Sequence, residues 1–301
     1  MKKLWVETYR PRFVADVILA PEMRKKFDNF VSDQSIPNLL LTGIRGTGKS
    51  TISKALIRDL KVDRSDVLRI ACSDEKIDGM RDKVKNFSMT MPNGEFKIVQ
   101  LEEFDMLSLE AQGLLRSLIE DTSNSCRFIA TCNYINKVIP ELRSRFQEFT
   151  FTAPDRDQVL LLMADILVKE AVEFDVDDLE KVVAAGYPDV RKIIQLMEAN
   201  SGDGVLKLDN DGGISDWKLS LLPLIEAGDI RGCRKLVCES ATKEELIDVY
   251  RYLYDNLHRC KKLKKQDEAV VLIAQYQYQH SFVSDQELQV AALFIELANL
   301  V

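Results

Sequence analysis

Between residues 39 and 151, short apolar runs alternate with longer segments in which apolar residues recur at helical spacing. Runs of four to seven apolar residues between amphipathic segments are typical of buried strands that alternate with helices. This order predicts an α/β fold with a mostly parallel sheet covered by helices. The predicted strands are Leu39–Thr42, Val67–Cys72, Lys97–Glu102, Arg127–Cys132 and Glu148–Phe151.

Beyond Pro154 the strand pattern stops and only helical periodicity remains. Residues 155–200 carry the first helical block, and a glycine- and aspartate-rich stretch, "SGDGVLKLDNDGG", reads as a linker. A second helical block fills the rest of the chain. We therefore predict three domains, at residues 1–153, 154–212 and 213–301, of which the last two are all-helical.

Composition narrows the class of protein without naming a partner. The 301-residue chain is 46% hydrophobic, and its net charge of −7 disfavours wholesale coating of nucleic acid but leaves room for a local basic groove. Its six cysteines form no CxxC pair and it has two histidines, so no zinc-ligand spacing is present. No apolar stretch approaches the roughly 18 residues of a membrane span. We expect a cytoplasmic protein with reduced cysteines and no membrane partner.

The segment "TGIRGTGKST" follows the first predicted strand and opens a helix. It satisfies the phosphate-loop pattern GxxxxGK[ST], in which backbone N–H groups at a helix N-terminus hold phosphate oxygens. Lys49 would bridge the terminal phosphates of ATP, and the Ser50 hydroxyl would ligate Mg²⁺. A glycine-rich turn without a ligand is the alternative. The residues predicted to hold the nucleotide are Gly46, Thr47, Gly48, Lys49, Ser50 and Thr51.

The strand in "KIVQLEEFD" runs directly into carboxylates. In a phosphate-loop ATPase a neighbouring strand ends in an acid that holds the water shell of Mg²⁺, and a second acid orients the attacking water. Glu102 and Glu103 are predicted to take these roles, although the first acid is usually aspartate. Asp105 is expected to support the turn or a neighbouring subunit. Gln100 needs a hydrogen-bond partner if it is buried.

Several segments in a fixed order together resemble the sliding-clamp loader subunits of the AAA+ ATPases. The segments are "VETYRP", "TGIRGTGKST", "CSDEKIDGMRDKVKNF", "QLEEFD", "AQGLLRSLIE", "FIATCNY", "LRSRF" and "PDVRKII". The chain is similar to the small subunits of replication factor C and, in size and in "LFIELAN", to the large subunit of the clamp loader of tailed phages. The resemblance implies a lid domain at 154–212 and a collar at 213–301 that joins subunits. A phage protein would act in the host cytoplasm.

The resemblance also implies nucleotide contacts outside the phosphate loop. Asn133 matches the sensor that bonds the attacking water or terminal phosphate, and Arg191 matches the second sensor, which contacts the nucleotide of its own subunit. A turn former and a surface arginine are the respective alternatives. The positions that match the surroundings of the adenine are Val6, Glu7, Thr8, Tyr9 and Ile18; an N-terminal strap packed on the core is the alternative.

In "SRF", Arg145 matches an arginine that reaches the nucleotide of the neighbouring subunit. A permanently charged guanidinium suits the charge of a phosphoryl-transfer transition state, and its supply by another chain makes hydrolysis depend on assembly. Phe146 replaces the cysteine of the family motif. Arg143 is expected to be a solvated surface charge.

Basic residues of one helix match the family's DNA-tracking surface. Arg81 and Lys85 lie four residues apart, on one helical face, with Lys76 just before the helix. Such a face can bind successive phosphates, whereas a solvated face balanced by aspartates is the alternative. Lys76 also matches a residue that couples DNA to catalysis. Gln112 and Arg116 match the coupler between subunits and DNA, with ordinary helix-surface polarity as the alternative.

In "NFSMTMPNG", Met89 and Met91 match the region near which the family touches its clamp. The basic run at 258–265 is expected to be a solvated helix end. The implied function is an ATP-driven subunit that opens a sliding clamp on primer–template DNA, together with copies of itself and a clamp-loader small subunit. Two alternatives remain: a scaffold subunit that binds ATP and DNA with little hydrolysis, and an AAA+ helicase loader.

Overall fold

A computed structural model describes residues 4–73, 77–207, 217–241, 246–257, 260, 265–280 and 282–300. These residues cluster into two compact units. Unit 1 comprises Met1–Leu162 with Pro188–Lys192, and unit 2 comprises Met163–Tyr187 with Ile193–Val301. The predicted division into three domains stays a prediction.

Unit 1 is built on a five-stranded parallel sheet in the order β2-β3-β4-β1-β5. All five predicted strands are confirmed, each within one residue at either end. The strands are β1 (Leu39–Gly43), β2 (Val67–Ala71), β3 (Lys97–Glu102), β4 (Cys126–Cys132) and β5 (Gln147–Phe151).

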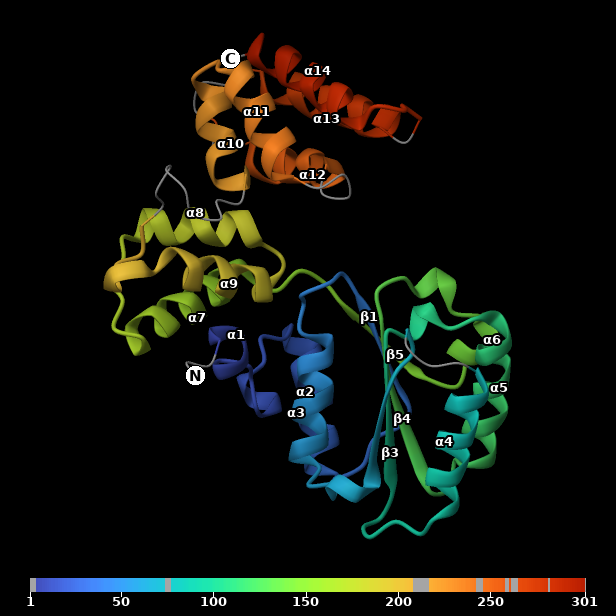
Figure 1. Cartoon of the computed structure of the whole chain (residues 1–301). Helices are drawn as coiled ribbons and strands as arrows, with labels where there is room; N and C mark the ends of the chain where they lie inside the picture. Colours follow the sequence, from blue (N-terminus) through green and yellow to red (C-terminus); the bar gives the residue numbers. More distant parts are fainter. Residues whose placement is uncertain are drawn as a thin grey trace. The chain divides into compact units, whose positions relative to one another are not determined.

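Burial along the strands follows their place in the sheet. The strands β1, β3 and β4 are interior and almost continuously buried, as expected of a parallel sheet covered on both faces, while the edge strand β5 alternates exposed and buried residues. Figure 1 shows α2 (Pro21–Ser32) and α3 (Lys49–Asp59) on one face of the sheet. The other face is covered by α4 (Ile77–Met89), α5 (Leu109–Asp121) and α6 (Pro140–Arg143).

Two hydrophobic cores fill the space between the sheet and its helices. Leu40, Val99 and Leu101 point into the core under α4 and α5, whereas Leu39 and Leu41 point into the core under α2 and α3. Because successive side chains of a strand alternate between faces, one apolar run in β1 supplies both cores. The parallel strands therefore end together at one edge, where the loops after β1, β3 and β4 meet.

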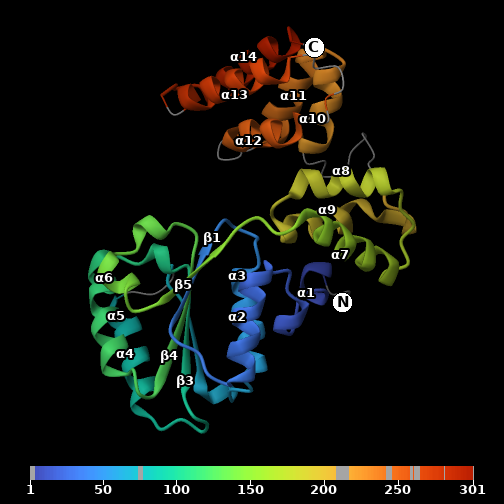
Figure 2. The same cartoon turned by 180° about the vertical axis from the view of Figure 1, so that it is seen from behind.

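The remaining described elements are helical, and Figure 2 shows them from the opposite side. A short N-terminal helix α1 (Trp5–Thr8) precedes the sheet. The later helices are α7 (Arg156–Lys169), α8 (Val176–Gly186), α9 (Val190–Asn200), α10 (Trp217–Glu226), α11 (Ile230–Ser240), α12 (Leu246–Asn256), α13 (Gln266–His280) and α14 (Gln286–Ala298). Helices α10–α14 share a core built around Trp217, Tyr250 and Phe294.

Within the described ranges, no helix is long and apolar enough to cross a membrane. The six cysteines all lie in described parts of the chain, and each is a free thiol.

Candidate nucleotide site

The loop between β1 and α3 has the backbone that a phosphate cradle needs. Gly43, Gly46 and Gly48 have φ angles of 140°, 77° and 91°, in the region that favours glycine. At Gly43 a Cβ atom would also collide with the carbonyl oxygen of Phe151 in the neighbouring strand. The loop therefore closes tightly against β5 and leads straight into the first turn of α3, which starts at Lys49.

Lys49 is buried at the base of this loop. Its ammonium donates to the carbonyl oxygens of Gly43 and Ile44, at 2.7 and 2.6 Å. Burial lowers the pKa of Lys49 to about 8, although Cys132, Asp105 and Asp189 act in the opposite direction. A buried ammonium whose partners among the described residues are carbonyl oxygens is a strong candidate to bind an anion, because phosphate oxygens would compensate its lost hydration.

Two residues that were not identified as site residues from the sequence lie against the phosphate loop. The carboxyl group of Asp189 lies against Gly46, where a larger residue would have no room, and a Val17 methyl group lies 3.9 Å from the Cβ position of Gly48. Asp189 also accepts from the backbone N–H of Lys192 and so caps the start of α9. Arg191, predicted to contact nucleotide, follows two residues later with an exposed side chain.

The N-terminal segment is fastened to α2 and α3. The backbone N–H of Val14 donates to Asp59 Oδ2 at 2.8 Å, at the end of α3. Arg24 of α2 donates to the carbonyl oxygens of Val14, at 2.6 Å, and of Val17. Trp5 of α1 is also buried.

Val17 of the strap lies next to the phosphate loop. The contacts of the strap with an adenine stay a prediction. Of the predicted adenine residues, Val6, Tyr9 and Ile18 are half-buried, while Glu7 and Thr8 are exposed. Neither the strap anchor Arg24 nor Asp59 was identified from the sequence, because each acts through a long-range contact to backbone atoms.

The two adjacent acids after β3 have different environments. Glu102 is half-buried and its Oε1 contacts Lys54 Nζ at 3.3 Å and Gln100 Nε2 at 3.2 Å. Glu103 is exposed and has a left-handed backbone, with φ 56° and ψ 47°. A non-glycine residue in this region costs energy and is common where function dictates the geometry. The chain thus turns at Glu103, directly after β3 ends at Glu102.

Asp105 supports the turn, one of the two roles expected of it. It is buried, and its two carboxylate oxygens accept from the backbone N–H groups of Asn133 and Tyr134, each at 3.2 Å. These bonds join the loop after β3 to the end of β4. They fix the half-buried Asn133, the predicted sensor, at the same edge of the sheet as the phosphate loop.

The residues at this edge of the sheet fit a Mg²⁺ ion bound together with a nucleotide better than a metal ion held by protein side chains alone. Within the described ranges, no group of three His, Cys, Asp or Glu side chains could hold a metal ion. Mg²⁺ usually keeps several water molecules and is bound through one or two protein oxygens plus substrate phosphates. The Ser50 hydroxyl in the first turn of α3 and the Glu102 carboxylate can supply such oxygens.

Comparison with known proteins follows this geometry. Residues 39–153, which run from β1 to just beyond β5, match the profile of the ATPase family associated with various cellular activities (AAA). Residues 39–153 thus form an AAA domain.

Curated relatives of the chain include replication factor C small subunits of archaea. The chain is 37% identical over 203 residues to the protein of Methanococcus maripaludis, an alignment that covers 66% of this chain and 64% of the relative. It is 37% identical over 211 residues to the protein of Sulfurisphaera tokodaii, with 68% and 64% covered. It is 36% identical over 207 residues to the Archaeoglobus fulgidus protein, an alignment that covers 67% of this chain and 65% of the relative. The chain thus matches somewhat less than two thirds of each relative's length.

Solved structures support the fold. The chain aligns with Thermotoga maritima RuvB, described as a Holliday junction branch migration motor, with a TM-score of 0.59 over 82% of this chain and 91% of that one. A variant of the same protein gives a TM-score of 0.60 with the same coverage. Sequence identity is 15% in both cases, so the likeness concerns the fold alone.

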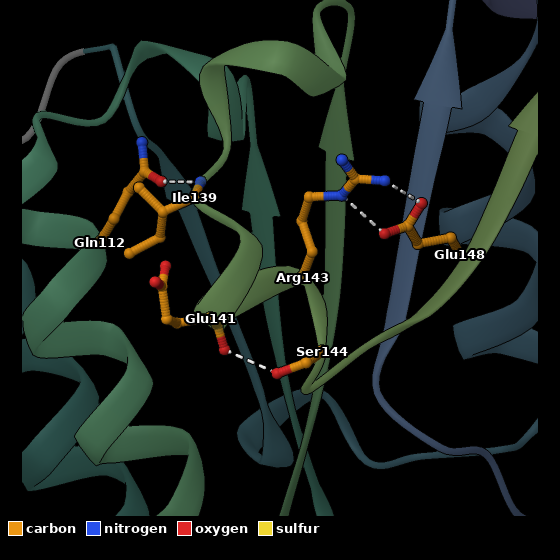
Figure 3. Close-up of polar contacts among 6 residues, drawn as sticks. All are labelled: Gln112, Ile139, Glu141, Arg143, Ser144 and Glu148. Atoms are coloured by element: carbon orange, nitrogen blue, oxygen red, sulfur yellow. Dashed lines mark hydrogen bonds and ion pairs between the residues drawn. The ribbon is translucent and has the colours of Figure 1, made fainter.

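In the AAA domain, Gln112 is part of the interior and not of the surface. Its Nε2 donates to the carbonyl oxygens of Leu107 and Lys137, at 3.2 and 3.0 Å, and its Oε1 accepts from the Ile139 N–H at 2.9 Å (Figure 3). A buried amide with all of these partners cannot also bind a DNA phosphate. The alternative of ordinary helix-surface polarity is therefore wrong for Gln112, which fixes the loop that leads into α6. Its role as a coupler between subunits and DNA stays a prediction.

The two arginines of "LRSRF" have separate partners in the AAA domain. Arg143 forms a bidentate pair with Glu148 of β5, with N–O distances of 2.8 and 2.9 Å (Figure 3). Arg145 pairs with Glu120 at the end of α5, and both of these side chains are largely exposed. Arg143 was expected to be a simple solvated charge, but its fork-like contact makes it part of the α6–β5 connection.

Phe146, which stands where the family motif has a cysteine, packs in the interior of the AAA domain. Its side chain is buried and meets the ring of Phe104 edge-on, with ring centroids 5.7 Å apart. Phe104 follows Glu103 directly. The segment that carries Arg145 is thereby packed against the segment that carries the acids.

The predicted DNA and clamp residues of the AAA domain lie mostly on its surface. Arg81 and Lys85 are exposed on α4, and Arg116 is exposed on α5. Met89 and Met91 are 72% and 90% exposed, unlike methionines of a core. Lys76 lies outside the described residues, as does most of the basic run at 258–265.

The exposed methionine segment is held by buried polar residues. Lys97 at the start of β3 is buried, and its ammonium donates to the Phe87 carbonyl oxygen at 2.8 Å and to Thr90 Oγ1. The buried Asp66 accepts from the backbone N–H of Asn93 at 2.7 Å. The end of α4 and the following turn are therefore an ordered surface feature.

Proposed function

We propose that the chain is an ATP-hydrolysing subunit of a sliding-clamp loader, which opens the clamp and places it on primer–template DNA. The observation that supports this most strongly is a phosphate loop with a buried Lys49 in a chain 37% identical to replication factor C small subunits. Within this class we favour the large subunit of a tailed-phage loader. Residues 154–212 would then be the lid and residues 213–301 the collar through which copies and a small subunit assemble.

The AAA domain would bind the nucleotide with residues from three segments. The loop N–H groups and the N-terminus of α3 would hold the phosphates, and Lys49 would exchange its two carbonyl partners for phosphate oxygens. Val6, Tyr9 and Ile18 of the strap would cover the adenine. Bound ATP supplies the transferable phosphoryl group, and Mg²⁺ neutralises part of its charge.

Hydrolysis needs a water molecule in line with the terminal phosphate. We assign this task to Glu103, an exposed acid with a left-handed backbone directly after β3. Asn133, fixed by Asp105, would bond the water or the phosphate. Arg191, at the start of α9, would contact the nucleotide of its own subunit. Glu102 and Ser50 would hold the water shell of the metal.

Arg145 would complete the site of a neighbouring subunit. Its exposed guanidinium is paired with a single exposed carboxylate, Glu120, an arrangement that contributes little stability and can be exchanged for phosphate. An isolated subunit would thus be a poor ATPase.

Arg81 and Lys85 on α4, with Arg116 on α5, would bind DNA phosphates without reading sequence. Lys76 would add a contact just before α4. A few contacts per subunit, repeated in an assembly, would suffice despite the negative net charge. Met89 and Met91 would contact the clamp, since flexible exposed thioethers adapt well to an apolar surface.

A scaffold subunit with little hydrolysis is the second candidate. One observation favours it: Glu102 replaces the usual aspartate and is already paired with Lys54. An acid engaged in this way could hold magnesium poorly.

The deciding experiment is an ATPase assay on the complete loader with its partner subunit. Clamp and primed DNA together should raise turnover well above the rate with either alone, while Lys49→Ala should show no stimulated turnover. Nucleotide binding with flat, slow turnover under all conditions would favour the scaffold. Absence of Lys49-dependent nucleotide binding would refute both candidates.

A further inference from the structure

Gln100 is a polar residue where the fold needs none. It lies in the interior strand β3 with no exposed surface, next to apolar neighbours such as Val99 and Leu101. Its Oε1 has no hydrogen-bond partner among the described residues. A buried acceptor without a partner reduces stability, and an apolar side chain of the same length would avoid this penalty. Stability therefore does not explain the glutamine.

The other end of the Gln100 amide has a definite partner. Its Nε2 donates to Glu102 Oε1 at 3.2 Å, and Gln100 and Glu102 project from the same face of β3 because they are two residues apart. The same oxygen is contacted at 3.3 Å by Lys54 Nζ. Lys54 lies four residues after Ser50 in α3, which is about one helical turn.

The Lys54–Glu102 pair is also a weak source of stability. Both side chains are about one-third exposed, at 31% and 32%, and ion pairs with this much solvent around them contribute little. Two contacts on one carboxylate oxygen do, however, restrict the orientation of the side chain. Glutamate has one more rotatable bond than the aspartate usual at this position, so it needs such a restraint more.

We propose that Gln100, assisted by Lys54, is a positioning residue that holds Oε1 of Glu102 and thereby fixes the carboxylate relative to Ser50 at the magnesium side of the nucleotide site. This inference rests on the proposed nucleotide-binding function. On this account Gln100 influences how strongly the site binds Mg²⁺. Side chains that hydrogen-bond to a metal-contacting group orient that group, and their loss typically weakens metal affinity about 10- to 100-fold.

The test is the Gln100→Met variant, which keeps the length of the side chain and removes its donor. Binding of a fluorescent ATP analogue to the full chain is titrated with Mg²⁺ and repeated in EDTA. We expect the Mg²⁺ concentration for half-maximal effect to rise about tenfold. Affinity in EDTA should stay unchanged, and the melting temperature should not fall, because an unpaired buried acceptor has been removed.

The matched control is the same substitution in a Glu102→Asp background. An aspartate is one methylene shorter and cannot reach the amide, so Gln100→Met should change the Mg²⁺ response there less than about twofold. An unchanged response to Gln100→Met in the original background would overturn the inference. An equal loss in both backgrounds would also overturn it, because the glutamine would then act through the fold.

Should Gln100→Met fail to fold, Lys54→Met in α3 takes its place in the same two backgrounds. The increase that Lys54→Met causes in the Mg²⁺ concentration for half-maximal effect must then be about fivefold larger in the original background than in the Glu102→Asp background. Equal effects would refute the inference. Failure of the proposed function looks different: the analogue would not bind, or would bind Lys49→Ala equally well. Intact Lys49-dependent binding without the coupling would refute the positioning role alone.

Discussion

The phosphate loop (residues 43–51) and the segment from Asn133 to Phe146, here called the sensor–finger segment, are placed and built differently. The loop follows the carboxyl end of β1, whereas the sensor–finger segment runs from the carboxyl end of β4 to the amino end of β1, where Asn38 Nδ2 donates to the Arg145 carbonyl oxygen. The phosphate loop is set by its own sequence: its glycines have positive φ angles and Lys49 bonds back to the loop itself. The sensor–finger segment depends on distant residues. Asp105 fixes its start and Gln112 fixes its middle.

We expect this difference to separate nucleotide binding from hydrolysis. A loop whose geometry depends mainly on its own residues should still bind nucleotide when the sensor–finger segment is perturbed. The sensor–finger segment links the acids after β3 to Arg145, since Phe146 packs on Phe104. Changes in the phosphate loop should therefore abolish binding, whereas changes in the sensor–finger segment should spare binding and affect turnover.

The largest effect is expected from Lys49→Ala. The substitution removes the buried ammonium group that the carbonyl oxygens of the loop hold. ATP binding should therefore fall by at least about 100-fold and turnover should disappear. Equilibrium binding of a fluorescent ATP analogue measures this. Near-normal affinity would show that the loop does not bind phosphates through Lys49.

Arg145→Ala should leave ATP affinity within about twofold and reduce turnover of the assembled complex about 1,000-fold, the range of a transferred arginine. Arg143→Ala is the matched control, because it removes an arginine two residues away whose partner is Glu148. That control should cost at most about 1 kcal/mol of stability and leave turnover intact. Equal losses of turnover in the two variants would contradict the assignment.

Gln112→Met should weaken the sensor–finger segment without touching the phosphate loop. The carbonyl groups of Leu107 and Lys137 and the N–H of Ile139 lose their partner, and we expect about 3 kcal/mol of destabilisation. Hydrogen exchange of residues 135–146 should accelerate first. Gln158→Met, at an exposed glutamine of α7, is the control and should change neither quantity. Accelerated exchange in the phosphate loop instead would break the comparison.

The smallest effect concerns pH. Burial lowers the pKa of Lys49 to about 8. Without nucleotide, the Lys49 side chain is therefore mostly protonated below pH 8 and loses its charge above it. Bound phosphates favour the charged form, and affinity should therefore fall as pH rises, by about fivefold between pH 8 and 9. Isothermal calorimetry in buffers of different ionisation enthalpy would detect the accompanying proton uptake. An affinity that stays flat to pH 9.5 would contradict the lowered pKa.

The same contrast explains what the sequence could predict. The strands and the phosphate loop follow from neighbouring residues, and so does the Ser108 cap of α5, where Ser108 Oγ accepts from the Ala111 N–H at 3.2 Å. The turn role of Asp105 was also among the expectations. Each of these signals lies within a few residues of the structure it specifies.

Other parts of the candidate site could not be predicted because their partners are remote in sequence. Gln112 shares a helical face with Arg116 in the sequence pattern, yet it is buried by a loop 25 residues away. Asp189 reaches Gly46 across more than 140 residues. The restraint on Glu102 by Lys54 needs the packing of α3 on β3. In each case tertiary packing, and not the local pattern, decides the role.

The most direct test of the account mixes two inactive subunits. Lys49→Ala lacks its own nucleotide but keeps Arg145, and Arg145→Ala binds nucleotide but lacks the arginine for its neighbour. If hydrolysis takes a nucleotide from one subunit and an arginine from the next, loaders assembled from both variants should regain clamp- and DNA-stimulated ATP turnover that neither variant has alone. Turnover of the mixture no higher than the sum of the separate variants would contradict this division of labour.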